Sequence, residues 1–498
     1  MDARALDPAD RRWDAMRSTH RRASMSTNRR VQPSKGHAPL NHPTGTVSET
    51  GSEGDDSSDE DESPRLIVVC EYRRLTTPGF RIALGDLQEV KVGRDSQRSL
   101  VRHGSTATLS VPDHGISRKH LAIRRQAAGW EVVDLGSKNG FLVNGRSTRT
   151  AVLSDGDLVE AGGTLLMFRE DGGSPDGDTD RDLAEEPDTP IVLRTVSSDF
   201  EYRLHQLARI ARGDVAVLIR GETGTGKERI AHAVHDLSGR TGPFIPINCG
   251  ALPRNLIESE LFGHKRGAFS GAHEEREGIV RRAHGGTLFL DEIAELPEES
   301  QVALLRVLQE GEVRLVGASD AIKVDIRVVA ATHQDIPARI ADGRFRQDLY
   351  ARLSGFEMVL PALRDRREDL GTLIAAILPR VTAKPERITL HRSAARALFR
   401  YAWPLNIREL EQALRSADLL VETGEIRLEH LSEAIRTYVP SSISGMRTEE
   451  RALREHMIAL LRDHGGNVSA VARAMGKAPV QIRRWCQRMQ IELTQFRS

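Results

Sequence analysis

One glycine-rich segment constrains the fold more than any other part of the sequence: Gly221-Glu222-Thr223-Gly224-Thr225-Gly226-Lys227. It follows an apolar run, AVLIR, and opens a stretch with helical periodicity, so the pattern predicts a turn from a strand into a helix. Glycines in such a turn let backbone N–H groups surround a phosphate, and the helix N-terminus adds partial positive charge. Lys227 could then reach the outer phosphate oxygens. The segment predicts a nucleotide site in a parallel α/β sheet.

The residue after this lysine is Glu228, where the general pattern has a Ser or Thr that holds magnesium. Another source is the apolar run TLFL over 287–290, which ends in Asp291 and Glu292. Carboxyl ends of parallel strands meet at one edge of a sheet, so these carboxylates should lie beside the phosphate loop. We expect Asp291 to organise Mg²⁺ through its waters and Glu292 to polarise an attacking water. Alternatively, the two carboxylates have no catalytic role, and the segment is a buried strand that ends in a solvated Asp-Glu turn.

The chain has 498 residues, more than one hydrophobic core usually fills, and its pattern changes along its length. Short apolar runs between turn signals over 65–170 predict an all-β sandwich. Apolar runs alternate with helical stretches over 191–365, which predicts a parallel α/β sheet, and 366–437 are helical in periodicity. The remaining ranges are predicted as a disordered segment (1–64), an acidic linker (171–190), a short linker (438–448) and a helical C-terminal region (449–498).

Charge is balanced in sum but segregated along the chain. Lys plus Arg and Asp plus Glu number 71 each, yet acids crowd the stretch around 53–62 and the 171–190 linker. From Arg447 to the end, ten Lys and Arg face five acids, which favours a polyanion as partner. Three scattered cysteines do not suggest a disulfide framework or a metal cage. Without a long apolar segment, a soluble cytoplasmic protein is expected.

The segment Glu260-Leu261-Phe262-Gly263-His264-Lys265-Arg266-Gly267-Ala268-Phe269-Ser270-Gly271-Ala272 carries the most specific resemblance. Residues 191 to about 437 resemble the AAA+ ATPase domain of bacterial enhancer-binding proteins, which activate sigma-54 RNA polymerase. In that family a GAFTGA loop touches sigma-54, and this chain has GAFSGA over 267–272, with Ser270 for the threonine. The resemblance implies ATP and Mg²⁺ as ligands and a homo-hexameric ring. It also implies that the whole segment 221–228, Glu222, Thr223, Thr225 and Glu228 included, surrounds the phosphates.

Other family positions match one by one. Asn248 resembles the asparagine that holds the catalytic glutamate, here Glu292, off the water until the ring is ready. Thr332 occupies the position of the first nucleotide sensor, and His333 follows it where asparagine is usual.

Three arginines lie in further matched segments. Arg346 and Arg352 fall in FRQDLYARL, the segment that sends arginines into the neighbouring subunit's site to stabilise charge on the γ-phosphoryl. Arg408 falls in WPLNIREL, which resembles the second nucleotide sensor, with Leu405 where glycine is usual.

Residues 65 to about 170 resemble a forkhead-associated (FHA) domain, a reader of phosphothreonine. The matching segments are Gly93-Arg94, Ser117-Arg118-Lys119-His120 and Gly136-Ser137-Lys138-Asn139-Gly140. A phosphothreonine carries about two charges and three acceptor oxygens, so a reader needs a guanidinium and hydroxyls on rigid loops. The resemblance implies that Arg94 and Ser117 take the phosphate, that Arg118, or Ser137 with Lys138, assists, and that Asn139 grips the peptide backbone. His120 is expected to brace the loop.

Residues 449–490 resemble the Fis-type helix-turn-helix that ends many of these activators. Pro479 suits the first turn of a recognition helix. Gln481, Arg484 and Arg488 share one side of that helix and could enter a major groove, while Lys477 and Arg483 could meet phosphates. Val480, Ile482 and Trp485 are expected to pack inside. The alternative is a basic helix that is only solvated.

These observations predict a multidomain transcription activator. An all-β FHA sandwich would sense a phosphothreonine protein, an α/β P-loop ATPase with a helical lid would remodel the sigma-54 RNA polymerase closed complex, and an all-α helix-turn-helix would bind double-stranded DNA upstream of promoters. One rival is a DNA-binding scaffold or repressor that uses its ATPase fold only for nucleotide-controlled assembly. Another, a replication-type AAA+ loader, would not need the GAFSGA loop.

Overall fold

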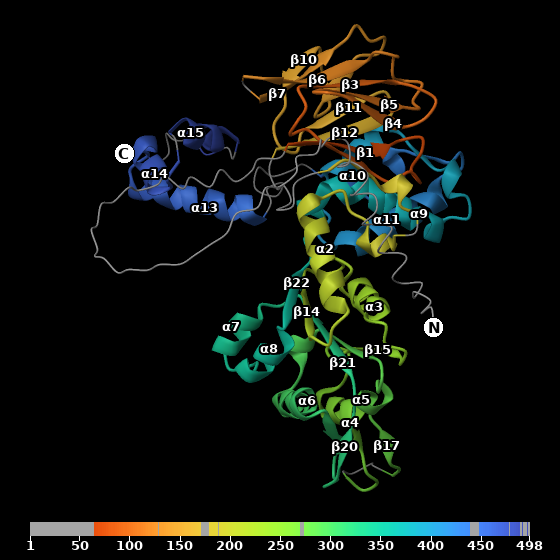
Figure 1. Ribbon diagram of the computed structural model, residues 1–498, viewed down its shortest axis with the longest axis vertical. Coiled ribbons are helices and arrows are strands. Elements are labelled where there is room, and N and C mark those ends of the chain that lie inside the picture. Colours follow the sequence, from red (N-terminus) through yellow and green to blue (C-terminus); the bar gives the residue numbers. More distant parts are fainter. Residues whose placement is uncertain are drawn as a thin grey trace, which may run out of the picture. The chain divides into compact units, whose positions relative to one another are not determined.

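The structure is a computed structural model of the chain, and it describes residues 64–127, 129–170, 179–187, 189–268, 273–438, 448–477, 479–488, 491 and 496 (Figure 1). The predicted disordered segment falls, apart from Pro64, outside these residues, as does 439–447 of the predicted short linker. Among the described residues, no helix is both long enough and apolar enough to span a bilayer. Cys70, Cys249 and Cys486 are buried thiols that form no disulfide.

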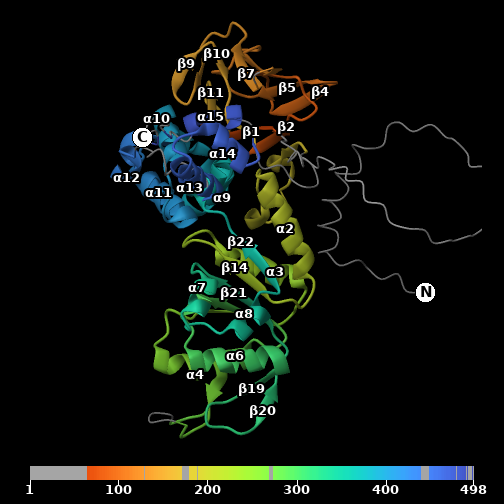
Figure 2. The same cartoon turned by 90° about the vertical axis from the view of Figure 1, so that its left-hand side faces the viewer.

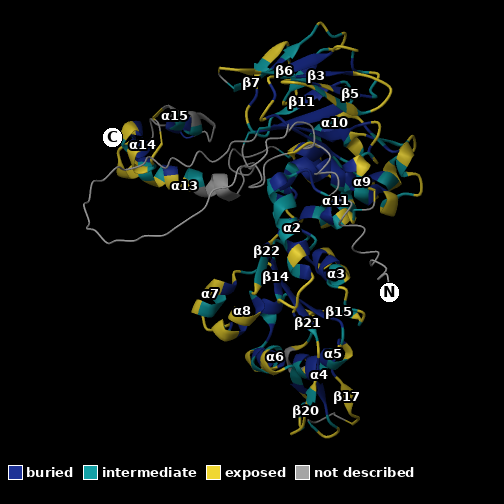
Figure 3. Cartoon of the chain, viewed as in Figure 1, coloured by how far each residue is buried: buried dark blue, intermediate teal, exposed yellow. Residues whose placement is uncertain are grey.

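Residues 65–182 form two packed β-sheets. One sheet has the order β13-β2-β1-β12-β11-β8-β9 and the other β10-β7-β6-β3-β5-β4. Their inner faces enclose one apolar core, and three of the four residues of β11 are buried (Figure 3). The strands are β1 (Arg65–Glu71), β2 (Phe80–Ala83), β3 (Glu89–Arg94), β4 (Ser99–His103), β5 (Thr106–Val111), β6 (Leu121–Gln126), β7 (Gly129–Asp134), β8 (Phe141–Val143), β9 (Arg146–Thr148), β10 (Thr150–Val152), β11 (Leu158–Ala161), β12 (Thr164–Arg169) and β13 (Arg181–Asp182).

Strand β1 is buried on both faces. All seven of its residues are buried, and alternate side chains enter different cores. Leu66 and Val68 fill the sandwich, whereas Ile67 and Val69 belong to a second core that contains helices of residues 363–435. A sheet that faces water on one side alternates apolar and polar residues, and β1 does not.

The range expected to be a solvated acidic linker needs correction in its second half. Strand β13 pairs with β2, and Leu183 is fully buried. The acids there are compensated by arginines of the sandwich: Asp180 accepts from Arg102 Nε at 2.6 Å, and Asp182 from Arg98 Nε at 3.2 Å. Ion pairing and burial of a leucine explain why these residues pack. Residues 171–178 lie outside the described chain.

The central region is a five-stranded parallel sheet in the order β15-β18-β21-β14-β22, with β14 flanked by β21 and β22 (Figure 2). Its strands are β14 (Val217–Arg220), β15 (Phe244–Asn248), β18 (Thr287–Asp291), β21 (Arg327–Thr332) and β22 (Phe356–Val359). The helices around it are α2 (Ser198–Ala211), α3 (Lys227–Ser238), α4 (Arg254–Phe262), α5 (Ile279–Arg282), α6 (Glu298–Glu310), α7 (Ile336–Ala341) and α8 (Gln347–Leu353). Helix α3 packs on β14, β18 and β21.

A buried arginine fixes α2 against this sheet. Arg327, 1% exposed, donates to four backbone carbonyls at and after the end of α2, including Gly213 at 2.6 Å and Ile210 at 3.3 Å. The last carbonyls of a helix have no partner within the helix, and a guanidinium satisfies them while complementing the helix dipole.

Two short hairpins extend from the same region. Strands β16 (Gly263–His264) and β17 (Arg276–Glu277) pair antiparallel and bracket the GAFSGA segment. Strands β19 (Glu312–Arg314) and β20 (Ala321–Lys323) form the second hairpin. The two are joined by backbone hydrogen bonds from Lys265 N to Val316 O at 3.0 Å and from Val316 N to Gly263 O at 2.8 Å.

The lid consists of α9 (Leu370–Val381), α10 (Arg392–Arg400), α11 (Asn406–Leu420) and α12 (Glu433–Arg436), with β23 (Thr389–Leu390) paired to β24 (Glu425–Ile426). A buried carboxylate links it to the start of α2. Asp369 accepts from Thr195 Oγ1 at 2.7 Å and from Val196 N at 2.8 Å, and burial raises the pKa of Asp369 to about 6.

The C-terminal region contains α13 (Thr448–Asp463), α14 (Val468–Ala474) and α15 (Pro479–Arg488). These helices enclose a small core of their own that includes Met457, Val471 and Ile482, with Trp485 packed against it. Asn467 caps α14 by accepting from Ser469 N at 3.1 Å and Ala470 N at 3.2 Å. Gly476, at φ +65°, ends α14 and begins the short turn into α15.

Candidate functional site: a phosphate loop held by the lid

The glycine-rich loop connects β14 to α3, as predicted. Gly224 and Gly226 have φ of +80° and +101°, a backbone region that favours glycine. Lys227, 8% exposed, begins α3, and its Nζ donates to the carbonyls of Gly221 at 3.0 Å and Glu222 at 3.4 Å. The buried ammonium is therefore held inside the curve of the loop.

The two carboxylates at the end of β18 lie beside this lysine. Glu292 Oε1 is 3.7 Å from Lys227 Nζ, and Glu292 itself has a left-handed backbone, with φ of 52°. Partial burial, followed by the charge of Glu292, raises the pKa of Asp291. A cation near Asp291 would lower this pKa again, because it favours the charged form of the carboxylate. Thr332 ends the neighbouring β21, and its carbonyl accepts from Gly221 N at 3.3 Å.

Asn248, the predicted partner of Glu292, ends the strand β15, which lies next to β18. Asn248 is paired in register with Asp291, but its Oδ1 accepts from Gly250 N at 2.9 Å and Ala251 N at 3.2 Å, so it caps a local turn. Glu292 is held by His333, whose Nδ1 lies 2.7 Å from Oε2. The bonds from Gly250 and Ala251 occupy the Oδ1 of Asn248, whereas a contact with the Glu292 carboxylate would use the Nδ2 donor, so the role of Asn248 toward Glu292 stays a prediction.

Two lid residues that the sequence did not single out grip the phosphate loop. Asn406 is fully buried, and its Nδ2 donates to Glu222 Oε2 at 3.2 Å and to Thr223 O at 3.0 Å. Arg364 Nη1 donates to Glu222 Oε2 at 2.8 Å, and Nη2 bonds the other carboxylate oxygen. Asn406 lay inside the matched WPLNIREL segment, and Arg364 lies in the charged run LRDRRED. Neither pattern indicates which loop these residues touch.

Gly224 and the lid approach each other closely. A Cβ at Gly224 would lie 2.1 Å from the carbonyl oxygen of Leu405, and Ile407 N donates to Gly224 O at 3.0 Å. Arg408, predicted to sense nucleotide, is exposed. Its Cβ lies 3.2 Å from the position that a Cβ on Gly224 would take. The structure thus brings Arg408 beside the phosphate loop.

The two predicted finger arginines do not join this site within one chain. Arg346 is the residue before α8 and pairs with Asp348 through two hydrogen bonds of 3.0 and 2.7 Å. Arg352, on α8, donates twice to Leu308 O, each at 3.1 Å. Neither is buried. Glu228, on the first turn of α3, is exposed.

The predicted phosphothreonine residues gather on adjoining loops of the sandwich. Ser117 Oγ accepts from Lys138 N at 3.1 Å, and Arg94 N donates to Ser117 O at 3.0 Å. His120, fully buried, accepts from Ser117 N at 3.0 Å and donates to Gly140 O at 2.9 Å, so it bridges two loops.

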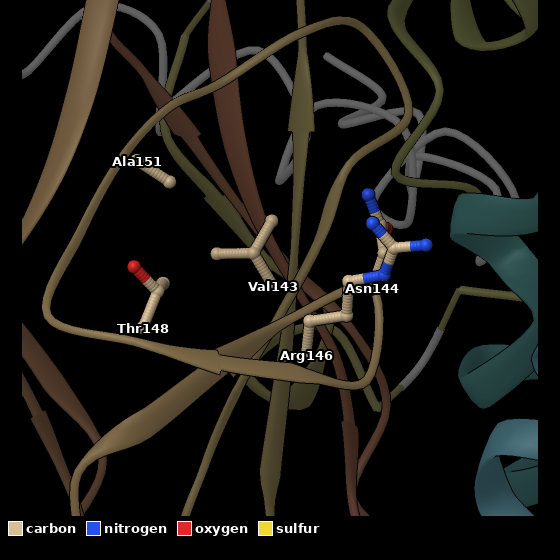
Figure 4. A pocket seen from close by; sticks show the side chains of 5 residues that line it. All are labelled: Val143, Asn144, Arg146, Thr148 and Ala151. Atoms are coloured by element: carbon tan, nitrogen blue, oxygen red, sulfur yellow. The ribbon is translucent and has the colours of Figure 1, made fainter.

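The outer residues of this loop cluster have room for a ligand. Arg94, Arg118, Lys138 and Asn139 are exposed, and Ser137 Oγ accepts from Gly140 N at 3.0 Å. A separate pocket on the sandwich is lined by Val143, Asn144, Arg146, Thr148 and Ala151, and none of the predicted phosphothreonine residues lines it (Figure 4).

Two predicted contact surfaces are described only in part. Gly267 and Ala268 follow β16, Gly267 with φ of +83°, while Phe269, Ser270, Gly271 and Ala272 lie outside the described residues. In the C-terminal region Lys477 is exposed and Gln481 is half-buried on α15. Arg483, Arg484 and Arg488 belong to α15, but their side chains are not described.

Together these features define a P-loop nucleotide-binding domain with a helical lid, preceded by an FHA-like sandwich. Comparison with family models agrees: residues 193–359 match the sigma-54 interaction domain, residues 364–445 the AAA+ ATPase lid domain and residues 90–162 the FHA domain. The transcriptional regulatory protein GlrR of Escherichia coli K12 is 40% identical over 315 residues, which cover 62% of this chain and 68% of GlrR. The chain belongs to the family of sigma-54-dependent transcriptional regulators.

Two other relatives match a similar share of the chain. The hydrogenase transcriptional regulatory protein HoxA of Cupriavidus necator is 41% identical over 60% of this chain and 66% of its own length. The Nif-specific regulatory protein of Enterobacter agglomerans is 41% identical over 58% of each chain. The chain thus spans between about half and two thirds of these relatives. NtrX from Brucella abortus, solved in complex with ATP, is 29% identical over 58% of this chain and 67% of that one, with a TM-score of 0.45.

We predict that Asn406→Ala weakens the lid's hold on the phosphate loop. The change removes the donors to Glu222 and Thr223 and leaves Leu363 N, which donates to Asn406 Oδ1 at 2.8 Å, without its acceptor. Unsatisfied buried groups cost about 1–3 kcal/mol, so the free energy of unfolding in urea should fall by about that much.

Asn144→Ala is the matched control. Asn144 and Asn406 have nearly the same left-handed backbone, with φ of 50° and 56°, but Asn144 is exposed. Asn144 also makes two side-chain hydrogen bonds, donating to Asp157 Oδ1 at 2.7 Å and accepting from Leu158 N at 3.0 Å, but both are exposed. Because the two variants share the backbone change and the loss of side-chain hydrogen bonds, their difference reports the cost of leaving the partners of Asn406 buried without a bond. Equal losses of stability would show that burial adds nothing to the lid contact.

Proposed function

We propose that the chain is a transcription activator that hydrolyses ATP to remodel the sigma-54 RNA polymerase closed complex, under the control of a phosphothreonine protein. The observation that carries this proposal is the convergence of Lys227, Asp291 and Glu292 at one sheet edge in a chain of this family. The β16–β17 hairpin, which presents the GAFSGA segment, supports a contact with sigma-54.

The nucleotide chemistry is assigned to the residues at that edge. Lys227 and the backbone of 221–228 bind the phosphates, and Asp291 is the residue that would hold Mg²⁺. Bound Mg²⁺ would neutralise charge on the phosphates. Glu292 takes a proton from the attacking water, and Thr332 and Arg408 report on the state of the nucleotide. His333, whose Nδ1 lies 2.7 Å from Glu292 Oε2, orients this carboxylate, and Asn248 holds it off the water until the ring is ready.

Arg346 and Arg352 act in a neighbouring subunit of a homo-hexameric ring. Neither is buried, and their hydrogen bonds go to Asp348 and Leu308 rather than to the phosphate loop of the same chain, which supports a role in trans. A guanidinium supplied by a neighbour would stabilise charge on the transferred γ-phosphoryl. Hydrolysis would then depend on assembly.

The FHA domain provides the regulation, and the C-terminal region directs the protein to its DNA site. In the FHA domain Arg94, Ser117 and Asn139, assisted by Arg118, Ser137 and Lys138, bind a phosphothreonine segment of a partner protein. In the C-terminal region α14 and α15 form a helix-turn-helix whose second helix enters the major groove of upstream DNA. Gln481, Arg484 and Arg488 read bases, and Lys477 and Arg483 contact phosphates.

A second function is considered because Ser270 and His333 differ from the residues usual in the family. The chain would then be a DNA-binding scaffold or repressor whose ATPase fold controls assembly without remodelling polymerase. Hydrolysis that is not coupled to promoter opening would favour this function.

We predict that Lys227→Ala and Glu292→Gln separate binding from hydrolysis. Lys227→Ala should abolish nucleotide binding, because it removes the cation inside the loop. Glu292→Gln should bind ATP with little change and lose at least about 100-fold in turnover, the usual contribution of a general base. Nucleotide titration and phosphate release distinguish the two variants, and wild-type turnover by Glu292→Gln would contradict the assignment of the base.

Promoter opening tests the function as a whole. The wild-type chain, ATP and sigma-54 RNA polymerase should melt a target promoter in a permanganate footprint. Phe269→Ala should keep ATP hydrolysis and lose melting, because Phe269 is the predicted contact with sigma-54. Ser270→Thr is the control, and it should keep both. Melting that survives Phe269→Ala would refute the role of this loop.

The phosphothreonine assignment is tested by matched peptides that carry Thr, phospho-Thr or Asp. Charge-assisted hydrogen bonds are worth about 1.5–3 kcal/mol, so Arg94→Ala should weaken phosphopeptide binding at least tenfold. The Asp peptide should bind poorly, because a carboxylate is planar and carries a single charge. Calorimetry that finds equal affinity for the Thr peptide would make the sandwich a different kind of interaction module.

A further inference from the structure

The FHA sandwich and the lid share one hydrophobic core. Ile67 and Val69, on the outer face of β1, lie in the same cluster of buried residues as Leu370, Ile374 and Ile377 of α9. Interior packing is as dense as that of organic crystals, so a shift of one side is transmitted to the other. The sandwich is thus a packed part of the ATPase rather than a tethered module.

The main chains of the two regions also touch. A Cβ at Gly371, on α9, would lie 1.6 Å from Val69 O, so only glycine fits there. Leu390 N, in the lid, donates to Tyr72 O at 2.8 Å. These contacts fix the register between α9 and the end of β1.

A buried carboxylate ties the sandwich to α10. Glu160, on β11 and 3% exposed, accepts from Arg396 Nε at 2.7 Å and Nη2 at 3.1 Å, and it also pairs with Arg392. Arg392 Nη2 donates to Gly162 O at 3.0 Å. Two guanidiniums of one lid helix therefore hold the hairpin between β11 and β12.

The other side of that hairpin meets the predicted phosphothreonine loops. Asp113 Oδ2 accepts from Gly163 N at 2.6 Å, and a Cβ at Gly115 would lie 2.8 Å from Gly162 Cα. Gly115 O in turn accepts from Asn139 Nδ2 at 2.8 Å. Asn139 is thus linked to α10 through one loop and one hairpin, in direct contact at each step.

The C-terminal end of α10 is followed by the residues that contact the phosphate loop. Trp403, 1% exposed, follows α10 and donates from Nε1 to Leu398 O at 3.1 Å. Three residues later Asn406 binds Glu222 and Thr223.

We propose that phosphothreonine binding by the FHA loops and nucleotide binding by the phosphate loop are energetically coupled through the lid, by way of the Glu160 hairpin and α10. This inference rests on the proposed function of both sites. Peptide binding that moves Asn139 and the 113–117 loop must move the hairpin, because close packing leaves no space to absorb the shift. The ion pairs of Glu160 pass that displacement to α10 and on to Asn406. The regulatory ligand therefore acts on the lid of its own subunit.

The experiment measures the affinity of the full chain for a fluorescent peptide pool with a fixed phosphothreonine, by anisotropy, with and without a non-hydrolysable ATP analogue and Mg²⁺. The two affinities should differ by at least about fivefold, the lower end of typical coupling. Saturating peptide should change the affinity for the analogue by the same factor, because coupling between two sites is reciprocal.

Arg396→Ala should bring the affinity ratio close to one while both ligands still bind. Arg400→Ala is the matched control: it removes an exposed arginine from the same helix and should keep the wild-type ratio. If Arg396→Ala melts at a much lower temperature than wild type, Glu160→Gln repeats the test with the shape of the side chain preserved.

Three results would overturn the inference. Peptide and analogue that both bind in the wild type without affecting each other would exclude coupling and leave the proposed function intact. Coupling that persists in Arg396→Ala and Glu160→Gln would exclude this route. Failure of the phosphopeptide to bind at all would contradict the phosphothreonine proposal itself, and the coupling with it.

Discussion

The hydrogen bonds from Asn406 to the phosphate loop are the contact on which the nucleotide edge depends. Asn406 is buried with a left-handed backbone, and it satisfies Leu363 N while donating to Glu222 and Thr223. Glu222 is held at the same time by Arg364. The loop that surrounds Lys227 is therefore shaped from outside as well as by its own glycines, and any movement of the lid changes the backbone groups offered to phosphate.

Local patterns were enough to predict the phosphate loop and its carboxylates. The turn over 221–227 is set by neighbours in sequence, since glycines, the preceding strand and the following helix occur together. The meeting of Lys227 with Glu292 followed from one topological rule, because parallel strands end at a common edge. The predicted brace at His120 also agrees with its two loop contacts.

Side-chain partners across long sequence separations could not be predicted in the same way. Asn248 and His333 both lie at or just after the ends of strands near Glu292, and only the geometry shows that His333 contacts Glu292 while the Asn248 oxygen caps its own turn. Residues 180–183 look like a solvated acidic linker until the arginines of β4 and its preceding loop are placed beside them. One signal was present: LIVVC and TLLMF are apolar without alternation, which is typical of strands covered on both faces.

The doubly buried β1 strand also bears on how such regulators can be recombined. A sensory domain joined by a free linker can be exchanged for another without changing the enzyme behind it. Here a transplanted sandwich would have to present apolar residues at the positions of Ile67 and Val69 and an acid at the position of Glu160, or α9 and α10 would face water. Sensor and lid are therefore expected to be inherited as a pair, and changes in one should be matched by changes in the other.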